Sequence, residues 1–274
     1  MLIDTHCHLN IATKQSFDTP LGHDDFITAQ TIIESAKNND VGIIINVGTS
    51  LIESFNCIAL AQRFESVYAT IGIHPNDLSS EWRDDLKQLE KYLKNKEQHK
   101  IVGIGECGLD RHYPNPDMQR QKDAFKAQID LALHYDVALV VHTRDAGHET
   151  LEALLPYSKQ ITKGIIHCFS ENIDFAKTVI DWNFAIGIGA TITYPKNKHL
   201  RHVVTTVDLQ DIVLETDTPF LPPQQLRGQK NYPAYTKITA EYLAQLRNES
   251  YEHVAQKTTK RALKIFNIHA EEQR

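Results

Sequence analysis

Six residues whose side chains bind divalent metals follow short apolar runs that are spread over most of the chain. They are His6, His8, Glu106, His142, His167 and Asp217. Each stands at the end of a run that is largely β-branched or aliphatic, as expected for a buried strand. Four imidazoles and two carboxylates can hold two metal ions, and a two-metal site activates water for hydrolysis. The sequence therefore predicts a hydrolytic centre.

The spacing of the first ligands assigns them to one ion. His6 and His8 are two residues apart, so both imidazoles project from the same face of a strand. Asp217 ends the last expected strand, which lies beside the first in a closed barrel. We expect Asp217 to reach the ion held by this histidine pair and to accept a proton from the attacking water.

The second ion is expected on the other side of a shared carboxylate. Glu106 follows Gly103 and Gly105, which leave room near the strand end, and its two oxygens can each hold one metal. Glu106 is therefore the expected bridge. His142 and His167 end successive strands and would supply neutral nitrogen ligands to the second ion.

Two further acidic residues have more than one interpretation. Glu215 lies two residues before Asp217, on the same face and deeper, where it either orients a ligand or takes part directly. Asp4 precedes the histidine pair, where it either orients an imidazole or is structural.

Eight strand-like runs alternate with helix-like segments and must position these residues. The expected strands are 2–6, 42–47, 67–73, 100–106, 137–142, 163–168, 184–188 and 211–216. Expected helices include 24–39, 50–64, 81–97, 118–135 and 175–180, and residues 235–246 and 251–266 form closing helices. This alternation predicts an α/β fold with a parallel sheet. Eight repeats favour a (β/α)8 TIM barrel with the two-metal site at the C-terminal ends of the strands.

No linker, low-complexity tract or change of composition marks a domain boundary. We expect residues 1–274 to form a single TIM-barrel hydrolase domain. The longest irregular region, 218–234, contains several prolines and is expected to be a functional loop.

The composition is that of an ordinary globular protein, with 41% apolar and 23% charged residues. The net charge of -6 argues against coating DNA by bulk electrostatics, although bound cations would reverse the sign at the site. The N-terminus shows no secretion signal and no stretch is long enough to cross a bilayer, which predicts a cytoplasmic protein without membrane association. Cys7, Cys57, Cys107 and Cys168 are expected to be small hydrophobic residues beneath the helices rather than ligands or disulfides.

Seven short motifs run in order over most of the chain. They are IDTHCH (3–8), GIHP (72–75), GIGECGLD (103–110), HTRDA (142–146), HCFS (167–170), LETDTP (214–219) and RGQKNYP (227–233). Together they resemble the TatD-type metal-dependent deoxyribonucleases of the amidohydrolase superfamily. The resemblance implies a metal-bearing TIM barrel, the same six ligands, and hydrolysis of phosphodiester bonds in DNA, commonly from the 3′ end.

The resemblance also implies residues that face the substrate. His74 is expected near the scissile phosphate as a hydrogen-bond donor or proton carrier, or else it is a turn histidine before Pro75. Arg144 is placed to fork onto phosphate oxygens, or else it forms an ion pair at the rim. Arg227 and Asn231, in the long final loop, are expected to help hold the substrate backbone.

These features predict cleavage of DNA by attack of a metal-activated water, as a 3′-to-5′ exonuclease on single strands or DNA ends. The expected cofactors are two divalent ions (Zn, Mg or Mn), and no obligate protein partner is indicated. Exposed aromatics near the mouth would stack bases or else pack loops; the candidates are Tyr113, Phe169, Tyr194, Phe220 and Tyr232. The alternatives are a two-metal hydrolase of a small amide, lactone, phosphoester or transfer-RNA ester, and a binding protein with structural metals. Open coordination positions argue against the last.

Overall fold

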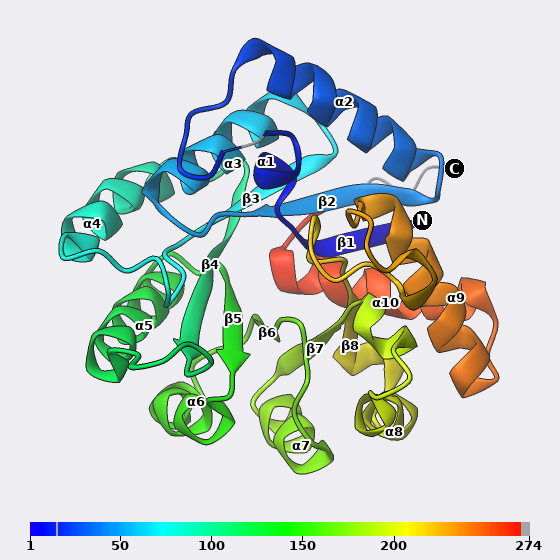
Figure 1. The fold of residues 1–274 in the computed structure, drawn as a ribbon. Helices are drawn as coiled ribbons and strands as arrows, with labels where there is room; N and C mark the ends of the chain where they lie inside the picture. The colour runs from blue at the N-terminus through cyan, green and yellow to red at the C-terminus, as the bar shows by residue number, and fades with distance from the viewer. Residues whose placement is uncertain (15, 270–274) are drawn as a thin grey trace.

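A computed structural model describes residues 1–14 and 16–269, in which eight parallel strands form one sheet in sequential order (Figure 1). The strands are β1 (Leu2–Cys7), β2 (Val41–Val47), β3 (Val67–Ile71), β4 (Ile101–Asp110), β5 (Ala138–Arg144), β6 (Gly164–Ile166), β7 (Phe184–Ile188) and β8 (Ile212–Leu214). All eight expected strands are present, and helices follow them around the outside of the barrel (Figure 1). The predicted TIM-barrel fold is confirmed.

The barrel closes between β1 and the segment that follows β8. The Thr5 hydroxyl donates to the Leu214 carbonyl at 3.0 Å. Beyond the end of β8, the Asp217 amide donates to the His6 carbonyl at 2.9 Å, and the His8 amide donates to the Thr218 carbonyl at 2.8 Å. The seam of the barrel therefore holds the first two histidines and Asp217 together through backbone hydrogen bonds.

Helices surround the sheet and supply its outer layer. The described residues form α1 (Leu9–Ala12), α2 (His23–Lys37), α3 (Leu51–Arg63), α4 (Trp82–Leu93), α5 (Met118–His134), α6 (Gly147–Leu154), α7 (Ile173–Asp181), α8 (Lys198–Thr206), α9 (Thr236–Arg247) and α10 (Tyr251–Phe266). Side chains of Ser50, Asn172 and Ser250 cap α3, α7 and α10, since each accepts a hydrogen bond from a backbone amide of the first turn. The sequence pattern does not predict the short helices α1, α6 and α8.

The apolar core has two parts. The larger cluster lies between strands and helices and includes Cys7, Cys57 and Cys107. The smaller one joins residues of the barrel interior, such as Ile45 and Val140, to the C-terminal part of α10. Because residues of α10 also lie beside the starts of β4 and β5, this helix closes the amino end of the barrel. The carboxyl end of the barrel instead carries the cavity described below. Within the described residues, no helix combines the length and the apolar character needed to cross a membrane.

Strand β4 continues four residues beyond Glu106, so the expected end at residue 106 is wrong. The register between β4 and β5 shifts between Ile104 and Cys107, which marks a bulge that contains Glu106. Gly105 has a φ of 134°, and a Cβ at this position would collide with the Val140 carbonyl, so only glycine fits. Bulges re-aim side chains, and this one turns Glu106 toward the barrel axis.

Candidate metal centre

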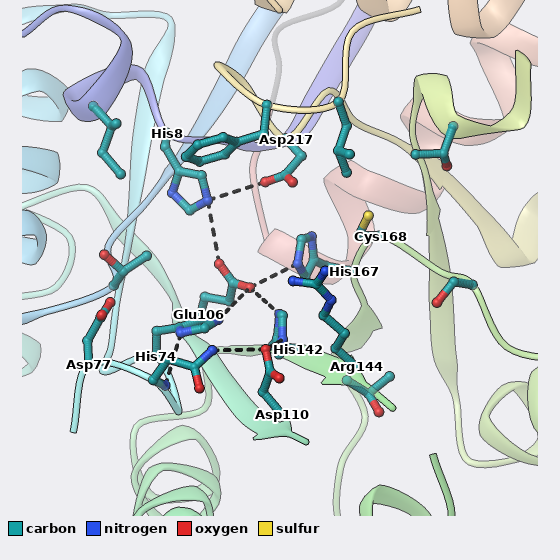
Figure 2. Close-up of a pocket in the computed structure, with 18 of the residues that line it drawn as sticks. His8, His74, Asp77, Glu106, Asp110, His142, Arg144, His167, Cys168 and Asp217 are labelled. Atoms are coloured by element: carbon teal, nitrogen blue, oxygen red, sulfur yellow. Dashed lines mark hydrogen bonds and ion pairs between the residues drawn. The ribbon is translucent and has the colours of Figure 1, made fainter. Parts of the chain in front are cut away.

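A cavity of about 700 Å³ opens at the carboxyl ends of the strands, and the predicted ligands converge at its floor (Figure 2). Five of the six line it, and His6 is fully buried against them. His167 directly follows β6, whereas Asp217 lies three residues beyond the end of β8, in the left-handed region with a φ of 61°. The backbone seam between Asp217 and His6 holds that conformation in place.

The two carboxylate oxygens of Glu106 face different groups. Oε2 lies 3.3 Å from Nε2 of His6 and 3.5 Å from Nε2 of His8. Asp217 approaches the same group, with Oδ1 3.4 Å from Nε2 of His8. His6, His8 and this oxygen of Glu106 lie close enough together to hold a cation, and Asp217 borders the same candidate position.

The other oxygen, Oε1 of Glu106, faces the later strands. It lies 2.7 Å from Nδ1 of His142 and 2.9 Å from Nε2 of His167. Nε2 of His74 is 3.7 Å away on the same side. A second group of nitrogen and oxygen donors is thus separated from the first by the width of one carboxylate, which is the arrangement that a bridging ligand requires.

Two of the ring nitrogens that point away from Glu106, those of His8 and His142, have acceptors of their own. Nδ1 of His8 lies 2.9 Å from the Val47 carbonyl, and Nε2 of His142 lies 3.0 Å from Oδ2 of Asp110. A carbonyl or carboxylate oxygen can only accept, so each of these nitrogens carries the proton. In a neutral ring the other nitrogen then presents a lone pair to the carboxylate of Glu106. Two lone pairs at 2.7 Å repel unless a cation or a second proton lies between them, so these residues fit a metal ion.

The charges at the site are consistent with this fit. Burial opposes ionisation of Glu106, but the charges of His167 and His6 outweigh it and hold the pKa of the carboxyl well below its usual range. Burial alone would lower the pKa of His142, but hydrogen bonds with Asp110 and Glu106 raise it above the ordinary value. The pKa of His167 is also raised, since the charge of Glu106 outweighs the effect of burial. A cation would take the place of protons that these histidines otherwise hold.

Asp110 is a functional residue that the sequence analysis missed. It is buried, its Oδ1 accepts from the His112 amide at 2.8 Å, and its Oδ2 accepts from the Asn76 side chain at 2.9 Å. Held in this way, it fixes the ring of His142. The signal was present in the sequence, because Asp110 lies an even number of residues after Glu106 and therefore on the same face of β4.

The structure places the two undecided acidic residues differently. Glu215 is fully buried, accepts from the Cys168 amide at 2.6 Å, and lies within ion-pair distance of His167, 3.5 Å from Nδ1, on the side of that ring away from Glu106. Asp4 accepts from the amide and hydroxyl of Thr216 at 3.0 and 2.6 Å, so it joins β1 to the end of β8. Its role is structural.

His74 and Arg144 both line the cavity. Nδ1 of His74 accepts from the Asn76 amide at 3.2 Å, which leaves the ring proton on Nε2, the nitrogen that faces Glu106. Burial, reinforced by the nearby His142, lowers the pKa of His74 to about 3, so the ring is a neutral donor. Arg144 is exposed at the end of β5 and forms no ion pair within the described residues, so the alternative of a rim salt bridge does not hold.

The expected substrate contact of Asn231 does not fit its position. Its side chain is fully buried, and Nδ2 donates to the carbonyls of Thr216 at 2.7 Å and Phe220 at 2.8 Å, so it holds the loop after β8. Arg227 is exposed with its guanidinium 4.8 Å from the centre of the Tyr194 ring, and it is not among the residues that line the cavity.

The structure also places two other side chains that the sequence analysis named, and the expectation for Cys168 is wrong. Cys168 does not lie beneath the helices but lines the cavity. Phe169 is buried in the core and is not available to a substrate. Phe17, which the sequence analysis did not single out, is exposed and lines the cavity.

Comparisons with known proteins agree with this fold and identify the family. A family model described as "TatD related DNase" matches residues 3–267. The chain is 33% identical over 268 residues to the uncharacterized metal-dependent hydrolase YabD of Bacillus subtilis, covering 98% of this chain and 100% of the relative. The crystal structure of YjjV, a TatD homolog from Escherichia coli, has a TM-score of 0.86 at 30% identity over 98% of each chain. A TatD family hydrolase from Entamoeba histolytica, at 19% identity and a TM-score of 0.79 over 96% of this chain and 97% of that chain, shows the same fold.

Proposed function

The chain belongs to the TatD-related DNase family of metal-dependent hydrolases, and on this premise we propose that it cleaves phosphodiester bonds in DNA, as a 3′-to-5′ exonuclease on single strands or DNA ends. The observation that carries the proposal is the division of Glu106, with one carboxylate oxygen toward His6 and His8 and the other toward His142 and His167. Arg144, unpaired within the described residues, stands on the wall of the same cavity and supports a phosphate as the group that enters.

Two divalent ions are the proposed cofactors. His6, His8 and Asp217 would hold one and His142 and His167 the other, with Glu106 between them. Nitrogen and oxygen donors without thiolate suit Zn, Mn or Mg. When bound, such ions lower the pKa of a water molecule and stabilise negative charge on the oxygens of a phosphate.

The protein's own side chains then have separate tasks. Burial alone would raise the pKa of Asp217, but the hydrogen bond with His8 and the charge of His167 lower it, so this carboxylate is ionised and accepts the proton of the attacking water. His74 donates a hydrogen bond from its Nε2–H group to a phosphate oxygen and keeps the proton, and Arg144 offers two parallel N–H groups to the same phosphate. The Asp217 side chain is 15% exposed, so a water molecule entering from the cavity can reach it.

Cleavage of defined oligonucleotides tests the proposal. Purified protein with Mg, Mn or Zn should shorten a single-stranded oligonucleotide from its 3′ end, and a blocked 3′ end should prevent this. A chelator should abolish cleavage, and so should Glu106→Gln, which keeps the shape of the side chain but cannot bridge two cations. Inertness toward every nucleic acid, together with turnover of a small lactone, amide or ester, would replace the proposal with hydrolysis of a small molecule.

A further inference from the structure

Exposed aromatic side chains gather around the mouth of the metal centre. Phe17, Tyr113 and Phe220 are 62%, 55% and 42% exposed, and all three line the cavity. Of the seven large apolar side chains that are exposed in the described part of the chain, these three and Leu221 border this one cavity. Exposed apolar groups that cluster at a cavity, rather than being scattered, indicate a binding surface.

The loop that carries Phe17 is anchored to the barrel by a buried carboxylate. Glu53, on α3, is 1% exposed and accepts from the Asp18 amide at 2.7 Å and from the Lys14 ammonium at 2.7 Å. Its second oxygen accepts from the Asn10 side chain at 2.8 Å. Burying a carboxylate is costly unless it is fully paired, and here its partners include the backbone amide of the residue after Phe17 and the side chain of Lys14, three residues before it. This exposed ring is therefore held at the edge of the cavity before any ligand arrives.

The other two aromatic residues are held in a similar way. Asn231, which is fully buried, donates to the Phe220 carbonyl at 2.8 Å. The loop of Tyr113 is joined to the metal centre by the hydrogen bond from the His112 amide to Asp110. Loops that are fixed in advance lose less entropy on binding, which is the behaviour of a preorganised ligand site.

The mouth has two chemically different sides. Its aromatic residues come from the loops that follow β1, β4 and β8, and the Phe220 ring lies 6.1 Å from the ring of His8. The end of β5 and the segments that follow β6 and β7 contribute polar residues instead, namely Arg144, Ser170, Thr191 and Asn197. Arg144 and His8 lie on opposite sides of Glu106 (Figure 2). A ligand that spans the cavity thus meets the three aromatic rings, with Thr49, Asn76 and Asp77 between them, on one side and hydrogen-bond donors and a positive charge on the other.

We propose that Phe17, Tyr113 and Phe220 form a stacking platform for the unpaired bases next to the scissile phosphate of a single-stranded end. This inference rests on the proposed nuclease function and deepens it. Aromatic side chains stack on any base, and polar groups along the other side track the sugar-phosphate backbone. In a duplex the faces of the bases are covered by their neighbours, so the platform has access to them only after the strands separate.

Alanine substitutions in the protein, combined with removal of bases from the oligonucleotide substrate, test the platform. On a single-stranded oligonucleotide, Phe17→Ala, Tyr113→Ala and Phe220→Ala should each raise KM on the order of ten-fold with a smaller change in kcat. Phe220→Tyr should retain the low KM, whereas Phe220→Leu, which is apolar without a flat π face, should not. Leu155→Ala is the matched control, because Leu155 is 59% exposed but does not line the cavity.

The same substitutions should lose their effect when the terminal nucleotides of the substrate are abasic, because the base and the aromatic ring form one interaction. An unchanged KM in the alanine variants, or an equal rise in KM on normal and abasic strands, overturns the platform while leaving the nuclease function intact. Wild-type protein that cleaves neither strand with any of the metals overturns the nuclease function, and the platform with it. Melting temperatures equal to that of the wild-type protein will show that the variants fold.

Discussion

Nε2 of His142 lies 3.0 Å from Oδ2 of Asp110, while Nδ1 of the same ring lies 2.7 Å from Oε1 of Glu106. Asp110 is held by two donors outside the candidate metal position, since its oxygens also accept from the His112 amide and the Asn76 side chain. The proton of the neutral ring is therefore drawn to Asp110, and the free lone pair faces the candidate metal position. Asp110 is a positioning residue that sets which nitrogen of His142 can bind a cation.

Asp110→Asn should weaken metal binding by about 10- to 100-fold, because an amide group facing Nε2 favours the other tautomer of His142. Calorimetric titration of the metal-free protein with Zn or Mn measures this loss without requiring activity. Asp130→Asn is the control, since Asp130 forms only an exposed ion pair with Lys126 on α5. Equal affinities in the wild-type protein and Asp110→Asn would remove Asp110 from the site.

Metal binding should weaken as the pH falls. The pKa values of His142 and His167 are raised from 6.5, so each ring holds a proton that a cation must displace. Below those raised pKa values the apparent affinity should fall about ten-fold per pH unit for every displaced proton, and above them it should level off. The lowered pKa of Glu106 adds no proton in this range. Calorimetry in buffers of different ionisation enthalpy should detect protons released when the metal binds. Metal binding without proton release, at an affinity independent of pH, would contradict the assignment of His142 and His167 as ligands.

Asn231 should matter for stability and Arg227 should not, although both lie in the loop after β8. Asn231→Ala removes the donor to the buried carbonyl of Thr216 and to the partly buried carbonyl of Phe220, at an expected cost of about 1–3 kcal/mol in the free energy of unfolding. Arg227→Ala removes an exposed side chain that stacks on Tyr194, and the expected change is within about 0.5 kcal/mol. Urea unfolding of the two variants compares them directly. Similar stability of both would mean that the loop does not depend on Asn231.

His74→Ala should reduce kcat on an oligonucleotide on the order of 10²-fold, the usual effect of losing one donor to developing negative charge. His74→Gln, whose amide can place an N–H near the same point, should recover part of the loss. Both variants should keep the metal content of the wild-type protein, because His74 is assigned to the substrate rather than to an ion. Loss of a metal ion in His74→Ala, measured by elemental analysis, would make His74 a ligand instead.

The sequence was sufficient to predict the barrel and the meeting of the six candidate ligands. Residues such as His142 and His167 follow apolar runs, and a parallel barrel brings the ends of its strands to one mouth. Only the order of the strands and helices along the chain is needed for this, and hydrophobic periodicity indicates that order.

Features that depend on local geometry were harder to predict. The bulge around Glu106 follows from close contact with the backbone of β5, and the buried position of Asn231 follows from the path of the loop after β8. Phe17 lies in a loop without periodicity, and its place at the cavity depends on Glu53. Each of these depends on contacts between segments distant in the chain, which spacing along the sequence does not encode.

Anomalous X-ray scattering from crystals soaked in Zn or Mn tests most directly whether the two carboxylate oxygens of Glu106 face two different metal ions. We predict two peaks, one beside Oε2 among His6, His8 and Asp217, and one beside Oε1 between His142 and His167. Crystals of Glu106→Gln should lose at least one of them. A single peak, or peaks away from Glu106, would contradict the two-ion centre on which the proposed function depends.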